Sequence, residues 1–506
     1  MYPPHNPVYQ RILGFHPYPL AFSKPPSHQL ARRESSQSSR EAWALLPAEL
    51  WAEVFLYCIQ TPQTEGTPMW YSRELAIPML LCQICRSWRQ IALSFSQLWQ
   101  RLTVCISMGK SYPSFELASI WIARSGTLPL SLSLYQQNES NLNRLVTGRM
   151  LALFMKHMPR WMDIDFRLAG PRLSNSLFPE HLGAPLLRRF NVRTNCRVYE
   201  REEKDIFGVF QEVPRLTHLE VSRIPELDLL GNSIINVPWA QLETLSMDYV
   251  PSVGTSLHIL SKCHSISACE MKIDSLFGPI FDSPLCHSRL LSLSISVSFE
   301  HFPGLLTMLT LPALRYLKVH VRGPLEQYGW PETCFEQFLE RSSCKLTRLE
   351  VHDSGMRVDQ FVGLLSSRKL QGLNALVVED RRDWTWDPFV TDIALELLHC
   401  PLYKDNYTAI VVLGGASIGG DSEHAGGRTC FLPNLTQLVV RGNCLRTSDG
   451  VIASMVETRW YQYMEGVAQL ESVKLDIPSN HFRDLQRLKT LQAKGLDLEL
   501  TFIDTL

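Results

Sequence analysis

One short stretch of the sequence has the pattern of a nucleophilic serine. Residues 415–419 read Gly-Ala-Ser-Ile-Gly and follow the apolar run at 409–413. In a hydrolase, such a strand and turn expose the serine, here Ser417, with an acidic residue and a histidine further along the chain. The turn must lead into a helix, but residues 419–427 are rich in glycine, and His481 has no motif around it. We therefore interpret Ser417 as part of a loop and keep a serine hydrolase as an alternative.

The thirteen cysteines suggest a second kind of chemistry. Cys82 and Cys85 have the Cys-x-x-Cys spacing of metal and redox sites, but no second Cys or His pair follows at the spacing of a zinc finger. Both lie in an amphipathic pattern beside Trp88, which favours core packing. An odd number of cysteines, scattered through apolar stretches, favours free thiols and a cytoplasmic or nuclear location. We expect no metal and no cofactor.

Composition narrows the classes of partner. The chain has 506 residues, 45% of them hydrophobic, and its net charge is −1. A chain so near neutrality gives no global electrostatic reason to bind nucleic acid or a membrane surface. It has no apolar run of about 18 residues that could span a bilayer, and its first 28 residues lack the apolar stretch of a signal peptide.

Two patterns divide the N-terminal part of the chain. Residues 1–42 hold seven prolines and a polar run at 35–39, so we predict a disordered tail. After it, Pro47 suits the first position of a helix, and Glu49 suits its first turn. Apolar residues at helical spacing then predict one helix after Pro47, another after Pro78, and a third apolar element at 98–102. A module this small is expected to pack against something else.

A strand pattern recurs in the rest of the chain. It consists of a hydrophobe, two variable residues, a hydrophobe, one variable residue and a hydrophobe. The copies begin at Leu187, Leu216, Leu242, Ile266, Leu290, Leu314, Leu346, Leu373, Leu435 and Leu470. From the first copy to the eighth, the intervals lie between 24 and 32 residues, which is typical of leucine-rich repeats. A propeller would need several strands in each period of about forty residues, and a doubly wound sheet would not repeat one motif so often.

The repeat is irregular. An Asn three residues after the last hydrophobe, which would bond to the turn, is present cleanly in one copy as Asn443. Segments 335–341 and 360–365 are predicted to form helices on the convex side. The long interval from 373 to 435 contains a Gly-rich insertion near 400–430. We therefore predict units of uneven length.

The segment before the repeats resembles the F-box family. The family's opening motif stands here as Leu-Pro-Ala-Glu-Leu at 46–50, followed by Val-Phe at 54–55. Its second-helix motif stands as Ile-Cys-Arg-Ser-Trp-Arg-Gln-Ile-Ala at 84–92, and its closing Leu-Trp at 98–99. The loop at 61–74 is longer than the family's usual connection. The resemblance covers about a tenth of the chain, and the next stretch is similar to the segment after the F-box in many fungal members.

This resemblance implies a partner and a set of contact residues. F-box modules bind the Skp adaptor and, through it, the cullin of a ubiquitin ligase. The implied contacts are Leu46, Pro47, Leu50, Val54, Leu81, Ile84, Cys85, Trp88 and Leu98. The alternative is that these residues form an internal helical core, and some are expected to do both. Such a protein acts by positioning its substrate, so we expect no enzymatic activity.

Two tryptophans form a candidate substrate-binding feature. Trp384 and Trp386 lie among paired charges just after the strand motif at 373–378. This composition is enriched at interface hot spots. The alternative, which we prefer, is that both rings cover the interior of a repeat, since most tryptophans are largely buried.

Together these patterns predict an α/β chain. It has a disordered tail at 1–42, a small helical F-box at 43–104, and an irregular leucine-rich-repeat-like solenoid at 105–506. The expected function is substrate recognition for a Skp–cullin–F-box ubiquitin ligase, with an unidentified protein as substrate. An F-box scaffold that does not drive degradation is a second hypothesis.

Overall fold

The computed structural model describes most of the chain. The described residues are 46–60, 77–169, 183–194, 212–223, 237–274, 284–323, 330–380, 388–400, 430–462 and 466–503. The predicted tail at 1–42, the loop at 61–74 and nearly all of the Gly-rich insertion therefore lie outside the described residues.

The N-terminal module is helical, as predicted. It contains α1 (Ala48–Gln60), α2 (Ile77–Ile84), α3 (Arg86–Ser94) and the 3₁₀ turn η4 (Ser96–Trp99). The carbonyl of Pro47 accepts hydrogen bonds from the N–H groups of Leu50 and Trp51, so α1 begins where the sequence places it. The second predicted helix is divided in two at Cys85, whose sulfur accepts a hydrogen bond from the N–H of Trp88 and caps α3.

The remainder is a mixed α/β fold built on one large, mostly parallel sheet. An antiparallel pair at one edge joins β1 (Arg101–Ser107) to β2 (Lys110–Tyr112). Beyond β1, every strand pairs in parallel with its neighbour, in chain order. These strands are β3 (Leu130–Gln136), β4 (Trp161–Leu168), β5 (Arg189–Thr194), β6 (His218–Arg223), β7 (Thr244–Val250), β8 (Ala268–Ile273), β10 (Ser292–Ser298), β12 (Tyr316–Arg322), β13 (Arg348–His352), β14 (Ala375–Asp380), β16 (Gln437–Gly442), β18 (Ser472–Pro478) and β19 (Asp497–Ile503).

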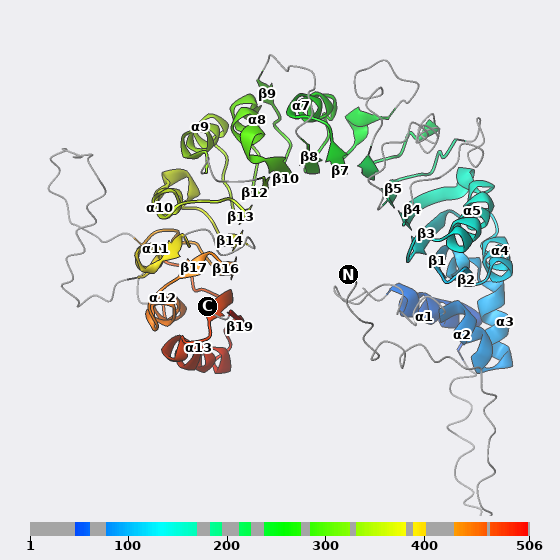
Figure 1. Cartoon of the computed structure of the whole chain (residues 1–506). Helices are drawn as coiled ribbons and strands as arrows, with labels where there is room; N and C mark the ends of the chain where they lie inside the picture. The colour runs from blue at the N-terminus through cyan, green and yellow to red at the C-terminus, as the bar shows by residue number, and fades with distance from the viewer. Residues whose placement is uncertain are drawn as a thin grey trace, which may run out of the picture.

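The sheet curves into an arc with helices on its outer side (Figure 1). Two short parallel pairs also lie between units: β9 (Leu285–Cys286) with β11 (Leu309–Thr310), and β15 (Val390–Thr391) with β17 (Leu445–Arg446). The outer helices are α4 (Phe115–Arg124), α5 (Asn141–Met155), α7 (Val253–Lys262), α8 (Phe302–Met308), α9 (Glu332–Ser342), α10 (Val358–Ser366), α11 (Asp392–Leu398), α12 (Val451–Trp460) and α13 (Phe482–Ala493).

All ten copies of the strand motif coincide with strands, namely β5 to β8, β10, β12 to β14, β16 and β18. The two predicted convex helices are confirmed as α9 and α10. Equivalent side chains stack because the strands pair in register: Leu293 of β10 lies beside Leu317 of β12, which lies beside Leu349 of β13. The ladder continues to Leu376 and Leu438, and all five side chains are at most 2% exposed.

Replacing a ladder leucine should weaken the whole sheet. Leu317→Ala removes buried methyl groups and leaves a cavity, so we expect the free energy of unfolding to fall by about 2–5 kcal/mol. Urea denaturation followed by circular dichroism measures this loss. Lys318→Ala, one residue along on the opposite face, is the matched control and should change stability by less than about 1 kcal/mol. Equal losses in the two variants would contradict the ladder's role.

Candidate functional site

The first helix carries apolar side chains on two sides. Ala52 and Phe55 point inward and are buried, whereas Leu50, Val54 and Tyr57 remain exposed. The exposed three are spaced by four and three residues, so they share one face of α1. A helix of this kind packs on one side and leaves an apolar stripe on the other.

An aromatic cluster holds the inner side of the module. The ring of Trp88 on α3 lies 5.0 Å from that of Trp51 and 4.9 Å from that of Phe55, both on α1. Next to it, Trp99 is fully buried and donates from Nε1 to the carbonyl of Ala92 at 2.8 Å. Trp99 also meets the ring of Trp121 edge-on at 4.9 Å.

Trp121 connects the helical module to the sheet. It lies on α4 and donates from Nε1 to the carbonyl of Arg101 on β1 at 3.0 Å. The guanidinium of Arg124 stands over the ring of Trp99 at 4.5 Å, a cation–π contact between α4 and the module. The small module is therefore packed against the first sheet unit, as its size requires.

The nine predicted contact residues differ in exposure: seven are exposed or half-buried, and two are buried. Leu46, Leu50, Val54 and Ile84 are 42%, 49%, 46% and 59% exposed, and Pro47 is also exposed. Cys85 and Trp88 are half-buried.

Leu81 and Leu98 are the two buried members of this set. They are 6% and 1% exposed and belong to the hydrophobic core. Their burial favours the alternative of an internal helical core for these two residues: α2 and η4 turn both side chains inward, where they pack.

Sequence reasoning missed three exposed apolar residues on the same helices: Tyr57, Leu80 and Leu93. Tyr57 follows Val54 by three residues, and Leu80 precedes Ile84 by four. Extending the helical spacing from the family motif would have found both. With Leu46, Pro47, Leu50, Val54 and Ile84, these three define what we call the apolar docking surface.

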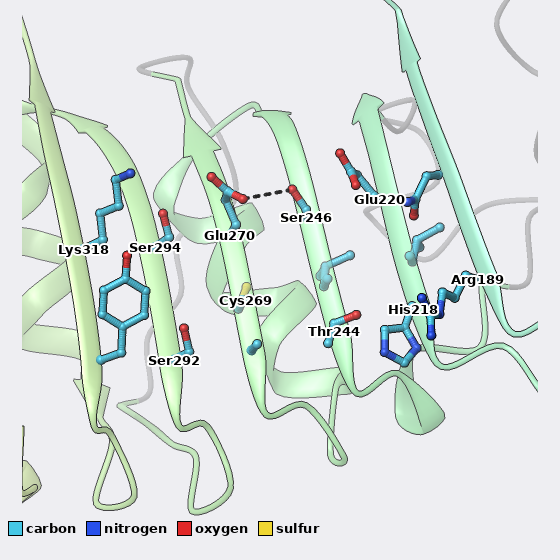
Figure 2. Close-up of a pocket in the computed structure, with 15 residues that line it drawn as sticks. Arg189, His218, Glu220, Thr244, Ser246, Cys269, Glu270, Ser292, Ser294 and Lys318 are labelled. Carbon is cyan, nitrogen blue, oxygen red and sulfur yellow. Dashed lines mark hydrogen bonds between the residues drawn. The ribbon is translucent and has the colours of Figure 1, made fainter. Parts of the chain in front are cut away.

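The inner face of the arc offers a second surface. Alternate side chains of β5, β6, β7, β8, β10 and β12 line a shallow hollow of about 490 Å³ (Figure 2). Its floor is made of small side chains, including Thr244, Ser246, Ala268, Ser292 and Ser294. Larger side chains line the two sides of the hollow: Arg189, His218 and Glu220 on one, and Lys318 on the other. Tyr316 lines the hollow from the same strand as Lys318, β12.

Charges line this hollow, and most of them are paired. Arg189 lies 3.7 Å from Asp163, Lys318 lies 3.8 Å from Glu350, and Glu220 pairs with Arg193. Glu270, near the centre, accepts a long hydrogen bond of 3.4 Å from the hydroxyl of Ser246 and has no ion pair with another described residue. The hollow therefore has a negative centre.

A second charged group lies beside the hollow on β12 and β13. Glu350, whose side chain is 9% exposed, is 2.6 Å from Arg348, 3.5 Å from His352 and 3.8 Å from Lys318. Burial disfavours its ionised form, but hydrogen bonds from His352 and Arg348 and the nearby positive charges prevail and lower the pKa of Glu350 to about 2. It is therefore ionised at neutral pH.

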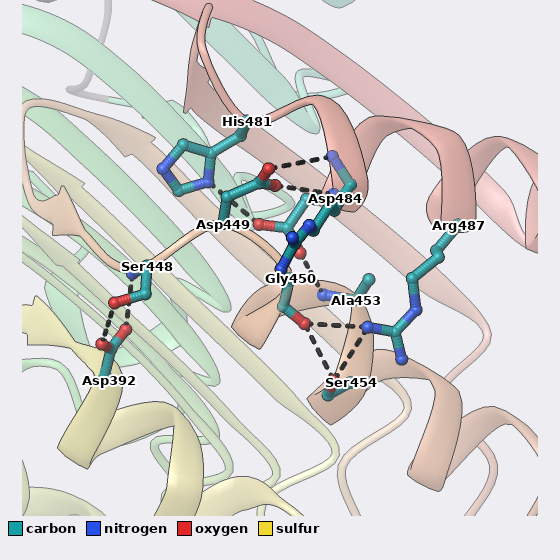
Figure 3. Close-up of polar contacts among 10 residues, drawn as sticks. Asp392, Ser448, Asp449, Gly450, Ala453, Ser454, His481, Asp484 and Arg487 are labelled. Carbon is teal, nitrogen blue, oxygen red and sulfur yellow. Dashed lines mark hydrogen bonds and ion pairs between the residues drawn. The ribbon is translucent and has the colours of Figure 1, made fainter.

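Asp449, His481 and Asp484 form a cluster of potential metal ligands (Figure 3), with ligand atoms within 4.8 Å of one another. Their oxygens are already engaged. Asp449 accepts from the N–H groups of Arg483 and Asp484, which begin α13, and these donors lower the pKa of Asp449 although burial opposes them.

Asp484 accepts from the N–H of Ala453 at 2.7 Å and lies 2.9 Å from Nδ1 of His481. The cluster thus caps α12 and α13, and we assign it a structural role. His481, the histidine weighed for a hydrolase, belongs to this cluster. Ser417, Trp384 and Trp386 lie outside the described residues.

Comparison with family models and with curated proteins gives no match. None of the helices among the described residues has the length and apolar character needed to cross a membrane.

The lowered pKa of Glu350 predicts a pH-dependent loss of stability. Its folded-state pKa lies below the ordinary value of 4.5, so its contribution is complete above that value and disappears as the pH falls toward 2. Glu350→Gln should therefore reduce the free energy of unfolding at pH 7 by roughly 1–3 kcal/mol, and the difference from wild type should shrink between pH 4.5 and pH 3.

Urea titrations at each pH test this. Glu270→Gln, on the same face and without an ion pair in the described part of the chain, is the control and should show a small difference at every pH. A difference for Glu350→Gln that stays constant across the range would contradict the assignment.

Proposed function

We propose that this protein is the substrate-recognition adaptor of a Skp–cullin–F-box ubiquitin ligase. In this proposal, residues 43–104 are an F-box that docks on the Skp adaptor. Residues 105–506 are an irregular leucine-rich-repeat-like solenoid whose inner face receives the substrate. The location proposed with this role is the cytoplasm or the nucleus.

The apolar docking surface is the observation that carries the proposal. Eight residues, on α1, α2 and α3 and just before α1, leave large apolar side chains or a proline exposed, although burying apolar area is worth about 25 cal/mol per Å². An exposed group of this kind marks a surface that a partner covers. Five of the eight are positions that the F-box resemblance names, and the aromatic cluster beneath keeps α1 and α3 in fixed relation.

The sheet supports the second half of the proposal. In-register leucine stacking, one strand per repeat and intervals of 24–32 residues are the features of a leucine-rich array. Arrays of this type bind through an extended concave surface. The hollow over β5 to β12, with Glu270 at its centre, supports a substrate segment that presents a basic side chain.

The mechanism in this proposal is positioning. An adaptor that holds a substrate near a ubiquitin-loaded enzyme raises the effective concentration of the substrate lysine and needs no nucleophile of its own. An F-box scaffold that does not drive degradation would use the same docking surface. The two functions therefore differ only in whether the bound partner is ubiquitinated.

Removing two docking side chains should weaken adaptor binding. Leu50→Ala with Ile84→Ala deletes two exposed apolar groups, and we expect affinity for the Skp adaptor to fall about 10–100-fold with an unchanged melting temperature. Co-purification and calorimetry measure both quantities. Leu142→Ala with Leu145→Ala, two leucines of α5 that are each 65% exposed, is the matched control and should bind as wild type.

The proposal is wrong if the wild-type chain retains no adaptor, or if the double variant retains as much as the control.

Ubiquitination separates the receptor from the scaffold. In a reconstituted reaction with Skp, cullin and a bound partner, the receptor role predicts partner ubiquitination that depends on Leu50 and Ile84. Adaptor binding without any ubiquitination of bound partners would favour the scaffold.

A further inference from the structure

A small apolar cluster lies apart from the main core. It consists of Cys400, just after α11, Cys430, shortly before β16, and Val467. The two thiols are 1% and 7% exposed, and their sulfur atoms lie only 2.9 Å apart. They are 30 residues apart in sequence, so the fold has brought them together.

A buried arginine adjoins the pair. Arg459 of α12 is 0% exposed and donates from Nε to the carbonyl of Leu398 at 2.6 Å. Its other donors reach the carbonyls of Phe431 and Leu432. The remaining contact is to the sulfur of Cys430 at 3.0 Å.

This arrangement leaves the charge of Arg459 without a carboxylate partner among the described residues. A buried charge is stable only when it is paired or fully hydrogen-bonded. Three carbonyls supply hydrogen bonds but no negative charge. Among the described residues, the sulfurs of Cys430 and Cys400 are the groups that can neutralise the guanidinium, by sharing one proton between them.

The pKa values agree with a shared proton. The hydrogen bond from Cys430 lowers the pKa of Cys400 to about 7; burial opposes this, and the charge of Arg459 adds to it. The same hydrogen bond and burial raise the pKa of Cys430. Loss of the first proton from the pair is thus easy and loss of the second is difficult, so near neutral pH the pair holds a thiolate beside a thiol.

We propose that Cys400 and Cys430 are a redox modification site, which a peroxide converts into a reversible disulfide. The thiolate of Cys400 attacks one peroxide oxygen, the O–O bond breaks, hydroxide leaves, and a sulfenic acid forms. The sulfur of Cys430 then attacks the sulfenic sulfur, and the S–S bond forms. Its own proton and the departing hydroxyl leave as water. Two thiols and one hydrogen peroxide give one disulfide and two waters, and two electrons pass from sulfur to oxygen.

Four other buried thiols in the described part of the chain lack these features. Burial raises the pKa of Cys263, Cys269, Cys344 and Cys444, so they stay protonated and unreactive. Cys286 is exposed but lies in no such pair among the described residues. The site is independent of the proposed ligase role, since it uses neither the docking surface nor the hollow.

Peroxide treatment of the full chain tests the site. After oxidation at pH 7 and alkylation with N-ethylmaleimide, we expect wild type to lose two reactive thiols and to yield one cross-linked peptide pair containing Cys400 and Cys430. Its mass should be about 2 Da below that of the two reduced peptides. A dithiol reductant should restore both thiols. The oxidation rate should rise with pH around a midpoint near 7, below the range of an ordinary thiol.

Three serine variants complete the design. Cys430→Ser should form no cross-link and should stop at a sulfenic acid on Cys400 that dimedone traps. Cys400→Ser should also form no cross-link. Cys286→Ser, the matched control, should oxidise as wild type. Retention of both alkylatable thiols at peroxide doses that oxidise Cys286, or a cross-link joining other cysteines, would overturn the proposal.

Discussion

In-register pairing of parallel strands is the constraint on which the rest of the molecule depends. A single strand with its helix cannot bury both of its faces, so each unit gains a core only from the units beside it. The leucines that stack from Leu293 to Leu438 form that shared core. This stacking also positions the two surfaces proposed to bind partners. It sends alternate side chains to the inner face and carries the N-terminal helices on the first unit through Trp121.

The same register organises the charges of the inner face. Residues at equivalent positions of neighbouring strands stand side by side, about one strand spacing apart. Lys318, Arg348 and Glu350 can therefore compensate one another across β12 and β13 without a loop to hold them. Glu270 has small neighbours at the matching positions, Ser246 and Ser294, and is left with a hydroxyl as its hydrogen-bond partner. The residues on neighbouring strands, rather than the total charge of the chain, determine which charges on this surface are paired.

Strands that recur by one motif could be predicted from the sequence, because burial of alternate residues is a local pattern. The same is true of α9 and α10, whose apolar spacing is helical. The division of the second helix at Cys85 could not be predicted, since it depends on a sulfur capping the next turn. The burial of Leu81 and Leu98 could not be predicted, because a motif shows which residues are apolar and not which side of a helix packs. The Cys400–Cys430–Arg459 group joins three distant segments, and no local pattern indicates such a meeting.

The open ends of the arc have a mechanical consequence. In the described part of the sheet, each strand pairs only with its neighbours along the arc, so the joints between units act in series (Figure 1). A slight rotation at every joint costs little at any one of them, yet the rotations add along the array. Small rotations at the joints are therefore expected to change the distance between the first and last strands more than they disturb the packing at any one joint. A curved array of this kind can adapt the width of its opening to a bound partner by distributing small rotations over many joints.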